Sequence, residues 1–74
     1  MKTLRQLRTA KLISLERLAA QAGVTAKTLS NIERGKQRPT YRSIEGICRA
    51  LDVEPTEVAE FKTVLDELAD KASE

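Results

Sequence analysis

The sequence contains no histidine, and this absence excludes several kinds of chemistry at once. The chain cannot form the usual zinc sites, the Ser/His and Cys/His pairs of hydrolases, or a switch that titrates near neutral pH. It has one cysteine, Cys48, so no internal disulfide can form. There is also no phosphate-binding loop and no obvious pocket with paired acids. We therefore expect no enzyme, and predict no catalytic residues, no metal and no cofactor.

Long apolar runs are also absent. No run approaches the roughly 18 residues that a membrane-spanning helix needs, and Lys and Arg interrupt the N-terminal stretch where a signal peptide would lie. We therefore expect a cytoplasmic protein with no membrane partner. The 74 residues make one small domain, and a domain of that size buries only about 60% of the surface of its unfolded chain.

The charge is divided unevenly along the chain. Residues 1–49 contain eleven Lys and Arg against three Glu, a net charge of +8, whereas residues 50–74 carry a net charge of −6. A basic body with an acidic tail indicates a polyanionic partner for the first part. Charge alone fits a solvated surface followed by an acidic C-terminal helix equally well.

Caps and apolar spacing predict helices along the whole chain. Thr3 and Gln6 form a capping-box pattern, and Ser14, Thr25 and Thr40 precede three further helical patterns. The predicted helices cover residues 4–11, 15–22, 26–34 and about 41–51, and a fifth begins at Pro55. Their inward residues are predicted as Leu4, Leu7, Ala10, Leu15, Leu18, Ala19, Ala22, Leu29, Ile32, Ile44, Ile47, Cys48 and Leu51. No segment shows strand-like alternation, so the predicted fold class is all-α.

The link between the second and third predicted helices is very short. Only residues 23–25 join them, which suits a sharp crossing better than antiparallel packing. Such a crossing needs a small residue where the helices meet, a permissive residue in the turn and an aliphatic residue that packs back. Ala19, Gly23 and Leu29 supply these three in order, which is the spacing of a helix-turn-helix.

Longer segments strengthen this interpretation. With "SLERLAAQAGV", "TLSNIERGKQRP" and "SIEGICRALDV", residues 4–60 resemble the Cro/phage-repressor type of helix-turn-helix regulators, also called the XRE family. The resemblance implies a compact five-helix lambda-repressor-like DNA-binding domain over residues 1–60. Residues 61–74 would form a C-terminal helical extension. It also implies that helix 26–34 enters the major groove of double-stranded DNA.

The resemblance assigns base reading to the outward side chains of helix 26–34. Asn31 can bond adenine, Lys27 can donate to guanine, and the methyl group of Ala26 suits thymine. Ser30 is the fourth expected base-reading residue. Contacts with the DNA backbone are expected from Ser14, Leu15, Thr25, Thr28, Lys36, Gln37, Arg38 and Arg42.

Five residues carry expectations of their own. Leu15 occupies a position where the family often has a glutamine that binds phosphate, so only backbone N–H groups can serve there. Arg8 and Glu33 match a buried ion pair of the family, with a partly exposed pair as the alternative. Tyr41 can either touch phosphate or pack at the start of its helix, and packing is the favoured expectation. Cys48 is expected to fill the core as a small apolar residue.

A heptad-like stripe begins near the end of the domain and extends past it. It consists of Val58, Phe61, Leu65, Leu68 and Ala72, spaced three and four residues apart. Such a stripe either pairs with a second copy of the chain or folds back onto its own domain. A homodimer would suit a regulator that reads two half-sites about 34–36 Å apart.

Two functions follow from these observations. The first is a sequence-specific DNA-binding transcriptional regulator, a repressor of prophage or mobile-element type, associated with the nucleoid when bound to DNA. The alternative is an antitoxin-like or accessory DNA-binding module whose C-terminal helix binds a protein partner. A stable free homodimer would favour the first function, and copurification with a second protein would favour the alternative.

Overall fold

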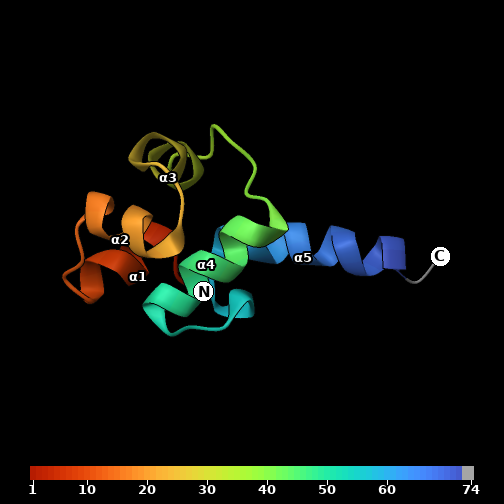
Figure 1. The fold of residues 1–74 in the computed structure, drawn as a ribbon. Helices are drawn as coiled ribbons and strands as arrows, with labels where there is room; N and C mark the ends of the chain where they lie inside the picture. The colour runs from red at the N-terminus through yellow and green to blue at the C-terminus, as the bar shows by residue number, and fades with distance from the viewer. Residues whose placement is uncertain (73–74) are drawn as a thin grey trace.

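The computed structural model describes residues 1–72 of the chain, with the side chains of residues 1–67. This part is helical and contains no strand, apart from one isolated bridge between Lys2 and Val58. The prediction of a compact all-α fold with five helices is therefore confirmed (Figure 1). The elements in order are α1 (Leu4–Ala10), α2 (Leu15–Ala22), α3 (Ala26–Glu33), α4 (Tyr41–Leu51), a 3₁₀ turn η1 (Pro55–Glu57) and α5 (Ala59–Ala72).

The first four helices begin at the predicted caps. The side chains of Thr3, Ser14, Thr25 and Thr40 each accept a hydrogen bond from the backbone N–H three residues later. Gln6 returns a bond to the backbone N–H of Thr3 at 2.9 Å, which completes the capping box. Each cap satisfies a backbone donor that the helix itself leaves free, so the sequence determines these starts locally.

The same four helices end in one kind of turn. The first or second residue after each helix adopts a left-handed conformation, and the next backbone N–H donates to a carbonyl five residues back. Glycine is favoured at such positions because it has no Cβ to clash. Gly23 and Gly35 follow that rule. The other two positions are occupied by Leu12 and Asp52, each with a φ of 56°.

One continuous core joins all five helices. Cys48 is 6% exposed and packs in it as the small apolar residue that was expected. Two predictions about burial are wrong: Ala10 is exposed at the end of α1, and Tyr41 is 65% exposed at the start of α4. The fully or nearly buried apolar residues are Leu4, Leu18, Ala19, Leu29, Ile32, Ile44, Ile47, Cys48, Leu51, Val58, Phe61 and Val64.

Helices α2 and α4 are in close contact at Gly46. A Cβ atom on this residue would overlap the carbonyl oxygen of Ala22. Gly46 is therefore required by packing and not by its backbone conformation, since its φ is not in the left-handed region.

The fifth helix begins later than predicted. Pro55 opens the short turn η1, and α5 starts only at Ala59. Between them Val58 remains extended, with φ −104° and ψ 120°, because it pairs with Lys2 in the isolated bridge. The Ala59 N–H donates to the Lys2 carbonyl at 2.9 Å. A contact with the other end of the chain therefore interrupts the helix, and local sequence does not reveal it.

The start of α5 closes the core, and the rest of the helix extends away from it. Val58 and Phe61 are fully buried, and Val64 is 8% exposed. Figure 1 shows α5 continuing past the other helices, so the molecule measures 39 Å along its long axis against 22 and 20 Å across. Among the residues that the structure describes, no helix is long and apolar enough to cross a membrane.

Candidate nucleic-acid interface

The turn between α2 and α3 has the predicted features. Ala19 is 2% exposed where α2 contacts its neighbours, and Leu29 of α3 is fully buried. Gly23 ends α2 with a φ of 78°, and Thr25 caps α3 two residues later. These residues fix the direction of α3 relative to α2. Ala19 and Leu29 are buried on either side of the turn, and Gly23 and Thr25 set where α2 ends and α3 begins.

Helix α3 lies at the edge of the molecule. In Figure 1 no other helix covers its outer side. Lys27 is exposed on that side, and Asn31 is half-buried one turn further along. Of the other two residues that were expected to read bases, both Ala26 and Ser30 are half-buried. Because Leu29 and Ile32 anchor the opposite side, the polar residues of α3 are presented together.

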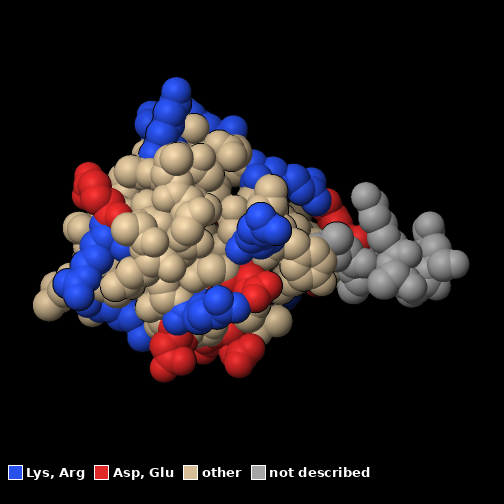
Figure 2. All heavy atoms as spheres, viewed as in Figure 1, with Lys and Arg blue, Asp and Glu red and all other residues tan. Residues whose placement is uncertain are grey.

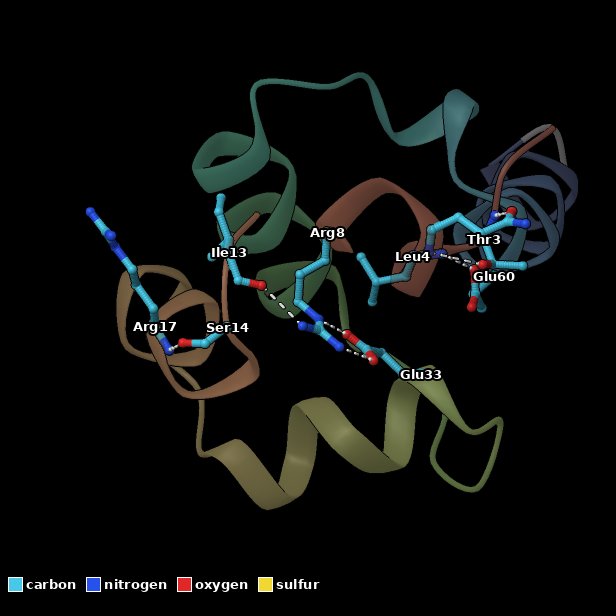
Figure 3. Close-up of polar contacts among 9 residues, drawn as sticks. Thr3, Leu4, Arg8, Ile13, Ser14, Arg17, Glu33 and Glu60 are labelled. Atoms are coloured by element: carbon cyan, nitrogen blue, oxygen red, sulfur yellow. Dashed lines mark hydrogen bonds and ion pairs between the residues drawn. The ribbon is translucent and has the colours of Figure 1, made fainter. Parts of the chain in front are cut away.

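The hydroxyl groups near the helix starts are partly committed to capping. Thr25 Oγ1 accepts from the Thr28 N–H at 3.1 Å and donates to Thr28 Oγ1 at 2.9 Å. The hydroxyl proton of Thr28 therefore remains free for another acceptor. Ser14 Oγ accepts from the Arg17 N–H at 3.1 Å, and its own proton is free as well (Figure 3). Leu15 follows, half-buried, with an apolar side chain.

The basic loop after α3 is folded against the end of that helix. The backbone N–H groups of Lys36 and Gln37 donate to the carbonyl of Asn31 at 2.8 and 3.3 Å. The side chains of Lys36, Gln37, Arg38 and Arg42 are all exposed. In Figure 2, Lys and Arg side chains lie at the upper edge, over α3 and the following loop, and others lie along the left edge and the lower front. Acidic side chains lie mostly at the lower edge, with others at the upper left and at the right.

One of these cations already has a partner within the chain. Arg38 forms an ion pair with Glu67 of α5, and both side chains are substantially exposed. The pair connects the loop after α3 to the acidic helix.

Helix α1 is connected to the end of α3 by an ion pair with two hydrogen bonds. Arg8 Nε donates to Glu33 Oε2 at 2.7 Å, and Arg8 Nη2 donates to Glu33 Oε1 at 3.2 Å (Figure 3). The third donor, Nη1, bonds the Ile13 carbonyl at 3.0 Å. The side chains of Arg8 and Glu33 are only 15% and 6% exposed. The hydrogen bonds to Glu33 raise the pKa of Arg8, although burial opposes this, so Arg8 remains charged.

Arg34 is missing from the residues that the sequence predicted to contact DNA. Arg34 is the exposed C-cap of α3 and follows Lys27 by seven positions and Asn31 by three. Residues with this spacing share one side of a helix. The spacing that places Arg34 on the same side of α3 as Lys27 and Asn31 is present in the sequence itself.

The C-terminal stripe is divided between two environments. Val58 and Phe61 are fully buried in the core of the chain itself, whereas Leu65 is half-buried on α5. The side chains of Leu68 and Ala72, the last two members of the stripe, lie outside the described residues.

Comparisons with known proteins agree with this geometry. The family model described as a helix-turn-helix domain matches residues 2–61. The chain is 36% identical over 61 residues to the control protein C.BamHI of Bacillus amyloliquefaciens, covering 81% of this chain and 75% of that protein.

A second relative is much longer than this chain. The chain is 41% identical over 51 residues to an uncharacterized HTH-type transcriptional regulator, y4dL, of Sinorhizobium fredii. The alignment covers 69% of this chain but only 26% of that protein. No solved structure matches the chain. The family match over residues 2–61 includes α2, the turn and α3. The chain therefore belongs to the Cro/phage-repressor (XRE) type of helix-turn-helix proteins, a family of DNA-binding transcriptional regulators.

Proposed function

We propose that the chain is a sequence-specific repressor, of prophage or mobile-element type, that reads the DNA major groove with α3. The observation that carries this proposal is the polar outer side of α3, where Lys27 and Asn31 lie opposite the buried Leu29 and Ile32. Helix α3 itself lies at the edge of the molecule (Figure 1). The major groove of B-DNA admits one α-helix, and its base edges present donors and acceptors that such side chains can distinguish. The basic loop beside α3 supplies cations for the phosphate backbone.

The proposal is tested by selecting bound sites from random duplex DNA and then measuring affinity for the selected site. Asn31→Ala should weaken binding to that site by about 1–3 kcal/mol and relax the base preference at one position. Lys36→Ala should weaken binding to all duplexes alike and reduce the slope of log affinity against log salt by about one.

Lys62→Ala provides a control, since Lys62 is exposed on α5, which lies away from α3. It should leave base preference unchanged. If Asn31→Ala and Lys27→Ala both preserve full affinity and base preference, α3 does not read the groove. If the wild-type chain shows no affinity for any duplex at low salt, the proposed function is wrong.

We also propose that two copies pair through the part of α5 that extends from the core. Residues 1–60 would bind DNA and residues 61–74 would hold the dimer, while Phe61 and Val64 anchor α5 to its own domain. Leu65 is the described stripe residue that is not fully buried by its own chain. A two-fold dimer would read a palindromic site with half-sites about one turn of DNA apart.

Light scattering on the purified chain tests the dimer. Leu65→Glu should give a monomer, because it places a charge in an apolar interface, whereas Thr63→Glu adds the same charge at an exposed position of the same helix and should remain dimeric. A wild-type monomer that copurifies with a second protein would instead favour the antitoxin-like or accessory module.

A further inference from the structure

A hollow of about 240 Å³ opens between α1 and α3. Arg8 and Glu33, which Figure 3 shows bridging the two helices, form part of its wall. It is bordered by the beginning of α2 and by the side of α3 next to its base-facing residues. The lining residues are Arg5, Arg8, Leu15, Ser30, Glu33 and Arg34.

The charges around this hollow do not cancel. Arg8 is committed to Glu33 through two hydrogen bonds and to the Ile13 carbonyl through a third. That pair is neutral as a unit. Arg5 and Arg34 are exposed, and neither forms an ion pair with any side chain that the structure describes. The guanidinium groups of Arg5 and Arg34 therefore line one hollow outside the ion pairs of the described side chains. Glu16 acts on Arg8 through its charge but is not among the residues that line the hollow.

The other lining groups suit an anion with several oxygens. Ser30 is half-buried beside the hollow, and its hydroxyl makes no hydrogen bond to another side chain within the described part of the molecule. The side chain of Leu15 has no hydrogen-bond donor. A ligand in the hollow would therefore accept hydrogen bonds from Arg5, Arg34 and Ser30. Guanidinium groups present paired N–H donors that match the geometry of phosphate oxygens.

We propose that Arg5, Arg34 and Ser30 together bind one backbone phosphate of the DNA that α3 reads. This inference rests on the proposed function, and it moves Ser30 from base reading to phosphate binding. The hollow adjoins α3, so a duplex seated on Lys27 and Asn31 brings its backbone to this place. The exposed arginines would hold a free anion only weakly, whereas the duplex supplies a phosphate at a position fixed by the rest of the interface.

The number of phosphates can be measured from the salt dependence of binding. Each neutralised phosphate contributes a slope of about −0.9 to log affinity against log salt. We expect Arg5→Gln and Arg34→Gln each to reduce the steepness of that slope. Because both bind the same phosphate, the double variant should lose about 0.9 in total. Affinity for specific and random duplexes should fall by the same factor, and Ser30→Ala should weaken binding without changing base preference.

Arg49→Gln is the matched control. It removes the same charge from the C-terminal end of α4, which lies apart from α3 in Figure 1. We expect its slope to stay within error of the wild type. Thermal unfolding of each variant checks that the folded population is the same as in the wild type.

Three results would overturn the proposal. The first is an unchanged slope in the double variant, and the second is a loss of about 1.8, which would mean two separate phosphates. The third is saturable binding of inorganic phosphate by the wild type that the double variant loses, although the double variant keeps the wild-type salt slope for DNA. That result would identify a site for free anions. In all three cases Asn31→Ala can still alter base preference, so the proposed function would survive. Absence of any DNA binding by the wild type would instead overturn both.

Discussion

Arg8 and Glu33 join the first helix to the end of the third through two hydrogen bonds, of 2.7 and 3.2 Å, in a nearly buried environment. Arg8 also bonds the Ile13 carbonyl, so one guanidinium fixes α3 against both α1 and the turn before α2. The position of α3 therefore depends on a polar contact as well as on the core.

Removing one partner of this pair should be costly. Arg8→Ala leaves the Glu33 carboxylate buried without its counter-charge, and we expect unfolding free energy to fall by roughly 3–5 kcal/mol. Urea unfolding followed by circular dichroism measures this. The double variant Arg8→Met with Glu33→Met should recover much of the loss, because no buried charge remains. A loss below about 1 kcal/mol in Arg8→Ala would show that the pair behaves as an exposed one.

Leu12 offers a way to stabilise the protein. It occupies a left-handed turn position with a φ of 56° and is 91% exposed, so its side chain contributes little packing. The left-handed conformation costs a non-glycine residue about 1–2 kcal/mol. Glycine avoids this cost, but it lowers the free energy of unfolding by roughly 0.4–1 kcal/mol because it increases the conformational entropy of the unfolded chain. Leu12→Gly should therefore stabilise the fold by roughly 0.5–1 kcal/mol in urea unfolding.

The neighbouring residue gives a matched control for that change. Lys11 is also exposed, but its φ is −94°, where glycine has no advantage. Lys11→Gly should lower stability by roughly 0.4–1 kcal/mol. Destabilisation by Leu12→Gly as large as that of Lys11→Gly would mean that the turn is not strained.

Cys48 should make stability depend on pH in the alkaline range. Burial, with smaller contributions from Glu54 and Glu57, raises the pKa of its thiol from the usual 9.0 to about 11. The unfolded chain therefore loses this proton at lower pH than the folded one. The contribution is fully present below pH 9 and is lost as pH rises toward 11, by up to about 2–3 kcal/mol.

Urea unfolding at several pH values between 8 and 11 tests this against Cys48→Ala, which has no thiol to titrate. The variant is less stable overall because it leaves a small cavity, but its stability should fall less steeply over that range. Parallel curves for the two proteins would show that the thiol ionises equally in both states.

The pair between Arg38 and Glu67 predicts that α5 competes with DNA. A phosphate that binds Arg38 must displace Glu67, so Glu67→Gln should raise affinity for duplex DNA. Exposed pairs contribute at most about 1 kcal/mol, which limits the gain to about two- to fivefold at low salt. Fluorescence anisotropy with a labelled duplex measures it.

Asp66→Asn removes the same charge from the adjacent exposed residue and serves as the control. A smaller gain there would show that the specific pair matters. Equal gains in both variants would attribute the effect to the overall negative charge of α5.

Most of the local structure could be predicted from the sequence, because it depends on contacts between near neighbours. Thr3, Ser14, Thr25 and Thr40 cap helices only a few residues away, and apolar spacing identifies the buried sides. The resemblance to a known family also brought Arg8 and Glu33 together, although 25 positions separate them.

The features that escaped prediction depend on distant parts of the chain. The delayed start of α5 results from the bridge between Lys2 and Val58, and the hollow combines Arg5 with Arg34 from different helices. The ion pair of Arg38 with Glu67 can be predicted only when the position of α5 relative to the loop after α3 is known. Tyr41 has a large aromatic side chain of the kind that usually packs in a core. As the first residue of α4, however, it is exposed to solvent.

The contacts between the two ends of the domain also determine when it can finish folding during synthesis. Lys2 pairs with Val58, and the Leu4 N–H donates to the Glu60 carboxylate at 2.9 Å. A nascent chain from which the ribosome has released only the first four helices lacks both contacts and the buried ring of Phe61. Because such long-range pairs form last and set the folding rate, the protein reaches its native state only once the beginning of α5 has emerged.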